Sequence, residues 1–334
     1  MSQIKPNRRN RKSPFSALAS GLGAAAGMTA AVAGGWILYS NLAIDHNIPL
    51  PKAINAERQE FSSKRTGKLS YYVDRQAAGR PLVLVHSVNA AASAYEMRPL
   101  FDHYRAQRPV FALDLPGFGF SDRPARSYDP LLYEDAVTDL LSSQVGEPAD
   151  VVALSLGCEF AARAALRRPE LFHSLAMISP TGFGLPATAR SSSDSLYALF
   201  SLPLWGRPLY DLIATRRSIL FFLQKSFVGP VPATMVDYAY ATAHQPGAEH
   251  APLHFISGKL FTPAVMRTVY ELVNTPTLVI YDRDAFTSFN ALPGLLEKNH
   301  HWHAVLLIPS FGLPHFEKLT ETTQELNVFW KDQG

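Results

Sequence analysis

Short runs of apolar residues recur along the chain from residue 69 onwards, and each ends near a polar or turn-forming residue. Runs of this length predict buried β-strands over residues 69–73, 81–85, 110–113, 151–154, 175–178, 277–281 and 304–308. Helical patterns lie between several of these strands, at residues 92–105, 131–145 and 156–167. Strands that alternate with helices predict an α/β fold, with a mostly parallel sheet covered by helices on both faces.

The alternation is interrupted over residues 181–272, where no strand pattern is found. This stretch instead contains apolar and aromatic segments with helical patterns, at residues 195–204, 209–213 and 219–227. We interpret it as a helical cap inserted between two strands of the sheet. The α/β core then consists of residues 67–180 together with residues 273–334, and residues 45–66 are predicted to form a polar linker.

The first 44 residues have a different pattern from the rest of the chain. Their only charged residues are five cations near the start, namely Lys5, Arg8, Arg9, Arg11 and Lys12. Residues 14–44 carry no charge and form a segment long enough to span a bilayer. Trp36 and Tyr39 lie towards its far end. Cations before such a segment predict a single-pass membrane anchor with its N-terminus inside and the rest of the chain extracytoplasmic. Ala31-Val32-Ala33 leaves a cleaved signal peptide, and so a secreted or periplasmic protein, as the alternative.

Composition and charge narrow the class of protein. Of 334 residues, 47% are hydrophobic and 18% charged, which excludes a disordered or fibrous chain. The net charge of +3 falls to −2 for the chain beyond residue 44, so a basic nucleic-acid-binding face is not expected. Cys158 is the only cysteine, which excludes an intramolecular disulfide and a cysteine-cluster metal site.

A small-x-Ser-x-Gly pattern, Ala153-Leu154-Ser155-Leu156-Gly157, lies where a predicted strand meets a predicted helix. A sharp turn at such a junction presents the serine hydroxyl at the carboxyl end of the sheet, and small residues on either side let the backbones pass. The pentapeptide alone is equally compatible with an ordinary serine in a strand–helix loop. Cys158 is expected to pack as a small apolar group, and Glu159 to be solvated or to face the cap.

Three further motifs follow strands in a fixed order. They are His86-Ser87-Val88-Asn89, the block Asp114-Leu115-Pro116-Gly117-Phe118-Gly119-Phe120-Ser121, and Gly312-Leu313-Pro314-His315-Phe316-Glu317. With the serine pattern, they make residues 60–334 resemble the α/β-hydrolase fold family, in its branch of capped serine esterases, C–C hydrolases and haloperoxidase-like enzymes. The resemblance implies an eight-stranded, mostly parallel sheet and a catalytic triad that needs no cofactor or metal.

The resemblance also implies a role for each matching residue. Ser155 matches the nucleophile and His315 the general base, while Asp284, after the strand at 277–281, matches the acid. Asp282 is its rival, although a surface turn carboxylate paired with Arg283 is the preferred interpretation of that residue. The order Ser155, Asp284, His315 along the chain is the order usual in this fold.

The oxyanion hole requires two backbone N–H groups, for which the resemblance indicates Leu156 and Val88. The family commonly has glycine where this chain has Ser87, and the Ser87 hydroxyl is a possible additional donor. The histidines at 300, 301 and 303 are expected to lie in a solvated turn rather than to bind metal, since no carboxylate is placed with them.

The predicted activity is hydrolysis of a carboxylic ester through an acyl-enzyme, because the elbow residue is serine rather than aspartate. Aromatic residues of the cap predict an apolar pocket, hence an apolar or lipid-like small-molecule ester; they are Tyr197, Phe200, Trp205, Tyr210, Phe221, Phe222 and Phe227. C–C bond hydrolysis and perhydrolysis or haloperoxidation are alternatives on the same triad. A non-catalytic, membrane-tethered binding protein is the alternative of another class.

Overall fold

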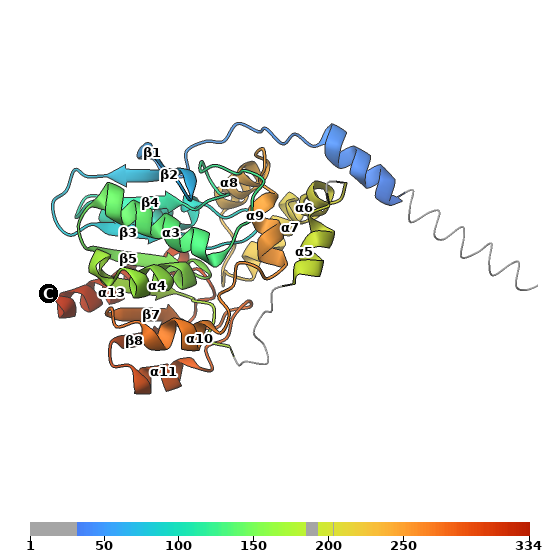
Figure 1. Cartoon of the computed structure of the whole chain (residues 1–334). Helices are drawn as coiled ribbons and strands as arrows, with labels where there is room; N and C mark the ends of the chain where they lie inside the picture. Colours follow the sequence, from blue (N-terminus) through green and yellow to red (C-terminus); the bar gives the residue numbers. More distant parts are fainter. Residues whose placement is uncertain (1–31, 185–192, 203) are drawn as a thin grey trace, which may run out of the picture. The chain divides into compact units, whose positions relative to one another are not determined.

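Eight β-strands form one sheet in the computed structural model, which describes residues 32–184, 193–202 and 204–334 (Figure 1). The strands are β1 (Glu57–Ser63), β2 (Gly67–Asp74), β3 (Leu82–Val85), β4 (Val110–Asp114), β5 (Ala149–Leu154), β6 (Phe172–Ile178), β7 (Thr277–Tyr281) and β8 (Trp302–Leu306). Their order is β1-β2-β4-β3-β5-β6-β7-β8. The β1–β2 and β2–β4 pairs are antiparallel and the other neighbouring pairs are parallel, which confirms the predicted sheet.

Helices connect most of the strands. In the described part of the chain these are α2 (Arg98–Tyr104), α3 (Pro130–Leu140), α4 (Gly157–Arg167), α5 (Asp194–Phe200), α6 (Gly206–Ile213), α7 (Arg216–Gln224), α8 (Ala233–Ala243), α9 (His250–Ile256), α10 (Val265–Thr268), α11 (Leu292–Lys298), α12 (Pro314–Glu317) and α13 (Leu319–Gln333). Single-turn helices are η1 (Ala94–Met97), η2 (Leu141–Val145), η3 (Pro169–Leu171) and η5 (Tyr270–Leu272).

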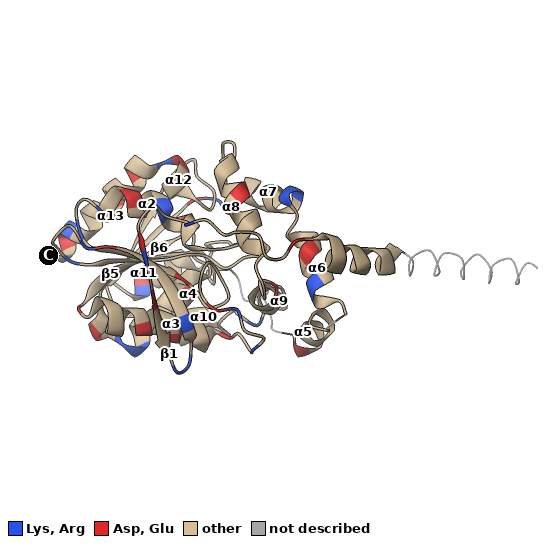
Figure 2. Ribbon diagram, turned by 90° about the horizontal axis from the view of Figure 1, so that it is seen from above, with Lys and Arg blue, Asp and Glu red and all other residues tan. Residues whose placement is uncertain are grey.

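The sheet separates two hydrophobic cores because successive side chains of a strand point to opposite faces. On β3, Val83 and Val85 pack in the core beneath α3, α4 and α11, whereas Leu82 and Leu84 pack in the core beneath α2 and α13. All four side chains are fully buried. Figure 2 shows α2 and α13 on one side of the sheet and α3 on the other, with charges of both signs along the outer helices.

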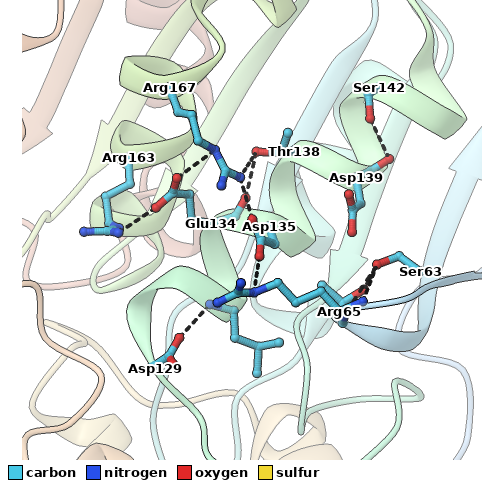
Figure 3. Close-up of polar contacts among 12 residues, drawn as sticks. Ser63, Arg65, Asp129, Glu134, Asp135, Thr138, Asp139, Ser142, Arg163 and Arg167 are labelled. Carbon is cyan, nitrogen blue, oxygen red and sulfur yellow. Dashed lines mark hydrogen bonds and ion pairs between the residues drawn. The ribbon is translucent and has the colours of Figure 1, made fainter.

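Ion pairs join α4, the helix that follows the predicted nucleophile, to α3 (Figure 3). The buried carboxylate of Glu134 accepts from Arg163 at 2.7 Å and from Arg167 at 2.8 Å. Arg167 also reaches Asp135 at 2.6 Å, and Asp135 is paired with Arg65 as well. Because the Glu134 carboxylate is buried, these bonds are stronger than those of an exposed pair and fix α4 on its neighbour.

Between β6 and β7 every described element is helical, as expected for the cap. Helices α6, α7 and α8 share a small core of their own, which contains Tyr210, Ile219 and Ala239. The last part of the insertion, α10 and η5, packs instead into the core beneath α4 through Val265 and Tyr270. The cap therefore covers one end of the sheet and rejoins the α/β core before β7.

The N-terminal part differs from the prediction in one respect. Residues 57–63, predicted to lie in a polar linker, form β1, which pairs with β2 from Glu57↔Val73 to Ser63↔Gly67. This edge strand has no buried residue and lacks an apolar pattern; it is held by backbone pairing and by Phe61, which packs against the core.

The chain divides into two units, residues 1–45 and 46–334. The first contains a helix over residues 32–43. Most of the predicted membrane segment, together with the basic tail, lies in residues 1–31, outside the described residues. Among the residues that the structure does describe, no helix combines the length and the apolar character needed to cross a bilayer.

Candidate active site

Ser155 occupies a sharp turn between β5 and α4, as predicted. Its φ of 51° is in the left-handed region that non-glycine residues rarely adopt, and its N–H donates to the Ile178 carbonyl at 2.9 Å. Two residues later, a Cβ on Gly157 would lie 2.3 Å from the carbonyl oxygen of His86. The absence of a side chain at Gly157 therefore lets the serine turn pack directly against the loop after β3.

The loop after β3 is held by the buried imidazole of His86. Its Nε2 accepts from the N–H of Leu115 at 3.0 Å, so the ring proton is on Nδ1, which donates to the Ser87 carbonyl at 2.5 Å. Burial lowers the pKa of His86 to about 4, which keeps this tautomer neutral. In a planar trans peptide the C=O and N–H point in opposite directions, so the N–H of Val88 points away from His86.

Both expected oxyanion donors are free to bind a ligand. Val88 and Leu156 line the same cavity as Ser155. Within the described part of the chain, neither backbone N–H has a hydrogen-bond partner. Two unpaired N–H groups beside a serine hydroxyl have the composition of an oxyanion hole.

The block from Asp114 to Ser121 is a structural support for this region. The Asp114 carboxylate accepts from the N–H groups of Ala94 and Phe120, each at 2.9 Å. Gly119 has a φ of 52°, and a Cβ there would lie 2.0 Å from that carboxyl group. Burial raises the pKa of Asp114 to about 6. The motif therefore joins two loops at the carboxyl edge of the sheet, and its carboxylate is fully buried and does not line the cavity that contains Ser155.

The structure distinguishes the two candidate acids after β7. Asp284 lines the cavity that contains Ser155, and its carboxylate accepts from the N–H of Phe286 at 2.7 Å. Asp282 is buried and accepts from the N–H of Ser310 at 2.9 Å. The expectation that Asp282 is a surface carboxylate paired with Arg283 is therefore wrong, because its side chain turns inward to fix the loop after β8.

His315 lies on α12, is fully buried, and is not among the residues that line the cavity. Its Nε2 is 2.7 Å from the carbonyl oxygen of Glu96, and its Nδ1 has no partner in the described part of the chain. Burial lowers the pKa of His315 to about 4. A carbonyl only accepts, so Nε2 carries the proton of the neutral ring. A rotation of the His315 ring by half a turn about its Cβ–Cγ bond would place Cε1, instead of Nε2, next to the Glu96 carbonyl.

A cavity of about 340 Å³ lies between the sheet and the cap. Its walls from the cap are mainly apolar and include Ile213, Ile219, Phe222, Leu223, Met235, Phe255, Ile256 and Phe261. Of the seven cap aromatics predicted from the sequence, Phe222 lines this cavity, whereas Tyr210 and Phe227 are buried elsewhere. The charged residues in its described lining are both acids, Glu96 and Asp284.

Glu96 is a buried acid of the cavity wall that the sequence analysis did not single out. It is the only charged side chain between Ala90 and Met97, and a lone acid in such an apolar stretch is the signal that marks it. Within the described residues, no group of three or more histidine, cysteine, aspartate or glutamate side chains is arranged to hold a metal ion.

Cys158 and Glu159, which follow the predicted nucleophile, also have clear positions. Cys158 is fully buried, with its Sγ 3.2 Å from the carbonyl oxygen of Ala153, which confirms its packing role. Glu159 is buried at the junction with the cap, where it accepts from the Thr181 hydroxyl at 2.5 Å and from the Thr262 N–H at 2.8 Å. Of the two expectations for Glu159, the cap-facing one is therefore confirmed.

Comparisons with known proteins agree with this architecture. Residues 82–317 match the alpha/beta hydrolase family. Over 145 residues the chain is 32% identical to the 2-hydroxymuconate semialdehyde hydrolase of Pseudomonas sp. (strain CF600), a match to 43% of this chain and 50% of that protein. The chain spans about half the length of the curated relatives it matches.

Solved structures extend the similarity over more of the chain. A membrane phospholipase A, described as a bacterial virulence factor, superposes with a TM-score of 0.66 at 20% identity, over 96% of this chain and 98% of that one. The meta-cleavage product hydrolase of Pseudomonas fluorescens IP01 gives a TM-score of 0.62 at 16% identity, over 83% and 98% of the two chains. These likenesses concern the fold, and the family match covers well over half of the sequence. The chain therefore belongs to the alpha/beta hydrolase family.

Proposed function

We propose that the protein is a serine hydrolase that cleaves carboxylic esters with an uncharged, apolar acyl group. The observation that carries the proposal is that Ser155, Asp284 and the free N–H groups of Val88 and Leu156 line one apolar cavity. A nucleophile, an acid and two oxyanion donors around one space are parts of an acyl-transfer site, and the buried His315 on α12 is the proposed general base.

In the proposed reaction the Ser155 hydroxyl attacks the ester carbonyl, and His315 accepts its proton at Nε2. The neutral ring must first turn away from the Glu96 carbonyl and change tautomer, with the Nε2 proton released to solvent and a proton taken up at Nδ1. Nε2 is then free to accept, and the Nδ1–H can donate to Asp284. The N–H groups of Val88 and Leu156 stabilise the oxyanion. The ester C–O bond then breaks, the alcohol leaves with the proton from His315, and water hydrolyses the acyl-enzyme by the same steps.

The charge of the cavity supports an uncharged substrate. Its described lining contains Glu96 and Asp284 but no lysine or arginine, so a second carboxylate on the substrate would be repelled and left unpaired. The curated relatives are named for a muconate semialdehyde and a succinate, which are both carboxylates. The apolar walls instead suit an acyl chain, and the likeness to a membrane phospholipase A over 96% of the chain favours a lipid-derived ester.

C–C bond hydrolysis is the second candidate, because the sequence match at 32% identity is to an enzyme named for that type of substrate. The two reactions differ in the charge that the cavity must accept. A matched pair of esters separates them: p-nitrophenyl pentanoate and the p-nitrophenyl monoester of succinate have acyl groups of similar length, and the second carries a carboxylate.

We expect the pentanoate to be hydrolysed with a kcat/KM at least about tenfold higher than the succinate monoester, since unpaired burial of a charge is costly. In a series from acetate upwards, kcat/KM should rise by up to about fourfold per methylene until the cavity is filled. Ser155→Ala and Asp284→Asn should abolish or strongly reduce turnover, and Asp282→Asn serves as the matched control. Preference for the succinate ester would favour the second candidate, and full activity of Ser155→Ala would refute both.

We also propose that residues 14–44 anchor the protein in a membrane with the hydrolase domain outside the cytoplasm. The charge-free sequence that follows five cations supports this orientation. Extraction of membranes with alkaline carbonate, followed by N-terminal sequencing, tests it. Retention of an uncleaved chain in the pellet is expected, whereas a soluble chain that begins near residue 34 would indicate a cleaved signal peptide.

A further inference from the structure

Glu96 is a carboxylate in the wall of the active-site cavity for which the proposed reaction has no use. It lies on η1, is 6% exposed, and has no lysine or arginine paired with it in the described part of the chain. A buried carboxylate without a cation is costly unless hydrogen bonds compensate for the lost water. The bonds that Glu96 makes therefore indicate its role.

Both carboxylate oxygens of Glu96 bind the loop that carries Val88. Oε2 accepts from the backbone N–H of Ser87 at 2.9 Å, and Oε1 accepts from Nδ2 of Asn89 at 2.8 Å. Asn89 Nδ2 also lies 3.0 Å from the Ser87 hydroxyl. One carboxylate thus holds the residue before Val88 and the residue after it.

These contacts fix two successive peptide planes, the second of which contains the Val88 N–H. Glu96 binds the Ser87 N–H of the first plane, and His86 Nδ1 donates to the Ser87 carbonyl of the second. Since each peptide is planar and trans, these two bonds together set the direction of the Val88 N–H. Without the first bond, the chain could rotate about the Ser87 φ and ψ, and the donor would lose its aim.

We propose that Glu96 is the positioning residue of the oxyanion hole, whose carboxylate clamps Ser87 and Asn89 so that the Val88 N–H stays directed into the cavity. This inference rests on the proposed function, because Val88 is a donor only if an oxyanion forms. Each carboxylate oxygen accepts one hydrogen bond from the loop, which assigns Glu96 a positioning role rather than one as an acid or base. Removal of one oxyanion donor costs about 10²–10³ in kcat, so loss of its alignment should cost part of that.

The test exchanges the carboxylate of Glu96 and the side-chain amide of Asn89 between the two positions. In Glu96→Gln, one amide oxygen still accepts from Ser87, but the new NH₂ group faces the NH₂ group of Asn89, and the clamp opens. In the double variant Glu96→Gln/Asn89→Asp, the amide donates to the new carboxylate, which also keeps the acceptor for the Ala91 N–H that Asn89 Oδ1 now provides. The full-length protein is assayed with p-nitrophenyl pentanoate, and kcat and KM are measured separately.

We expect Glu96→Gln to lower kcat by about 10–100-fold with KM within about twofold, and the double variant to recover most of kcat. Glu134→Gln is the matched control, because Glu134 is equally buried but binds α4 instead of the loop; it should lower stability and leave kcat unchanged.

Two results would overturn the proposal: an unchanged kcat in Glu96→Gln, or a double variant that folds but is no more active than the single one. If Glu96→Gln does not fold, Asn89→Ala replaces it and should lower kcat without raising KM; an unchanged kcat there also counts against the clamp. Loss of activity in Ser155→Ala shows that the proposed function holds in the same assay, so a failure of the clamp alone is distinguishable.

Discussion

Gly157 is the position where the structure makes the sharpest prediction about the active site. In Gly157→Ala the new Cβ would lie 2.3 Å from the His86 carbonyl oxygen, 3.3 Å from the His86 carbonyl carbon and 3.4 Å from Val85 Cγ1. Ordinary contact begins near 3.4 Å, so the serine turn and the loop after β3 must separate by about 1 Å. The obstructing atoms belong to the backbone and cannot rotate away.

Two effects follow from this separation. Overpacking of a well-packed site costs about 1–3 kcal/mol of unfolding free energy, which urea denaturation measures. Displacing the proposed Val88 donor by about 1 Å relative to Ser155 and Leu156 should reduce kcat about 100-fold, which ester turnover measures. The drop in kcat should be larger than the decrease in the fraction of folded protein explains. The reason is that the serine turn contributes one proposed donor, Leu156, and the loop after β3 contributes the other, Val88.

Gly294→Ala is the matched control for this substitution. Gly294 lies within α11, has an ordinary φ, and has no atom within 4 Å of the position that a Cβ would take. Alanine there should raise the unfolding free energy by about 0.5–1 kcal/mol through helix propensity and leave kcat unchanged. A Gly157→Ala variant with wild-type stability and a kcat within about twofold of wild type would refute the packing of the serine turn described above.

Three further predictions concern buried groups near the site. Asp114→Ala leaves two buried N–H groups unpaired and should lower the unfolding free energy by about 2–4 kcal/mol in urea denaturation; a loss below about 0.5 kcal/mol would contradict the bonds described. Burial raises the pKa of Glu159 to about 7, so the folded state retains a proton that the unfolded state loses. Between about pH 4.5 and pH 7 the contribution of Glu159 to the unfolding free energy should therefore fall as pH rises, so the unfolding free energy of the wild type relative to Glu159→Gln should fall over this range; a constant difference would count against it. Burial also raises the pKa of the Cys158 thiol, so this cysteine should react with Ellman's reagent only after unfolding, and rapid reaction of the native protein would show that it is accessible.

The α/β core was predictable from the sequence because its strands are buried on both faces. β3 is apolar throughout and β5 is apolar from Val151 to Leu154, and such runs can be recognised without knowledge of their neighbours. The edge strand β1 escaped prediction because none of its residues is buried and all but Phe61 are polar. Its position is set by pairing with β2, which a local pattern does not record.

The proposed site was predictable where the chemistry depends on local backbone. The turn at Ser155 needs small residues at fixed spacing, so the motif itself indicates the geometry. The roles of Glu96 and Asp282 depend on partners far along the chain or across a loop, and burial of an acid cannot be derived from its neighbours in sequence. The orientation of the His315 ring is a side-chain torsion set by the Glu96 carbonyl, and no sequence pattern specifies it.

Covalent labelling of the nucleophile tests the central claim most directly. The full-length protein is treated with a fluorophosphonate in its native state, and the modified peptide is identified by mass spectrometry. The proposed mechanism predicts a single phosphonylated residue, Ser155, with no labelling in Ser155→Ala and much slower labelling in His315→Ala. Labelling at another serine, or a folded protein that turns over esters but is not labelled at Ser155, would contradict it.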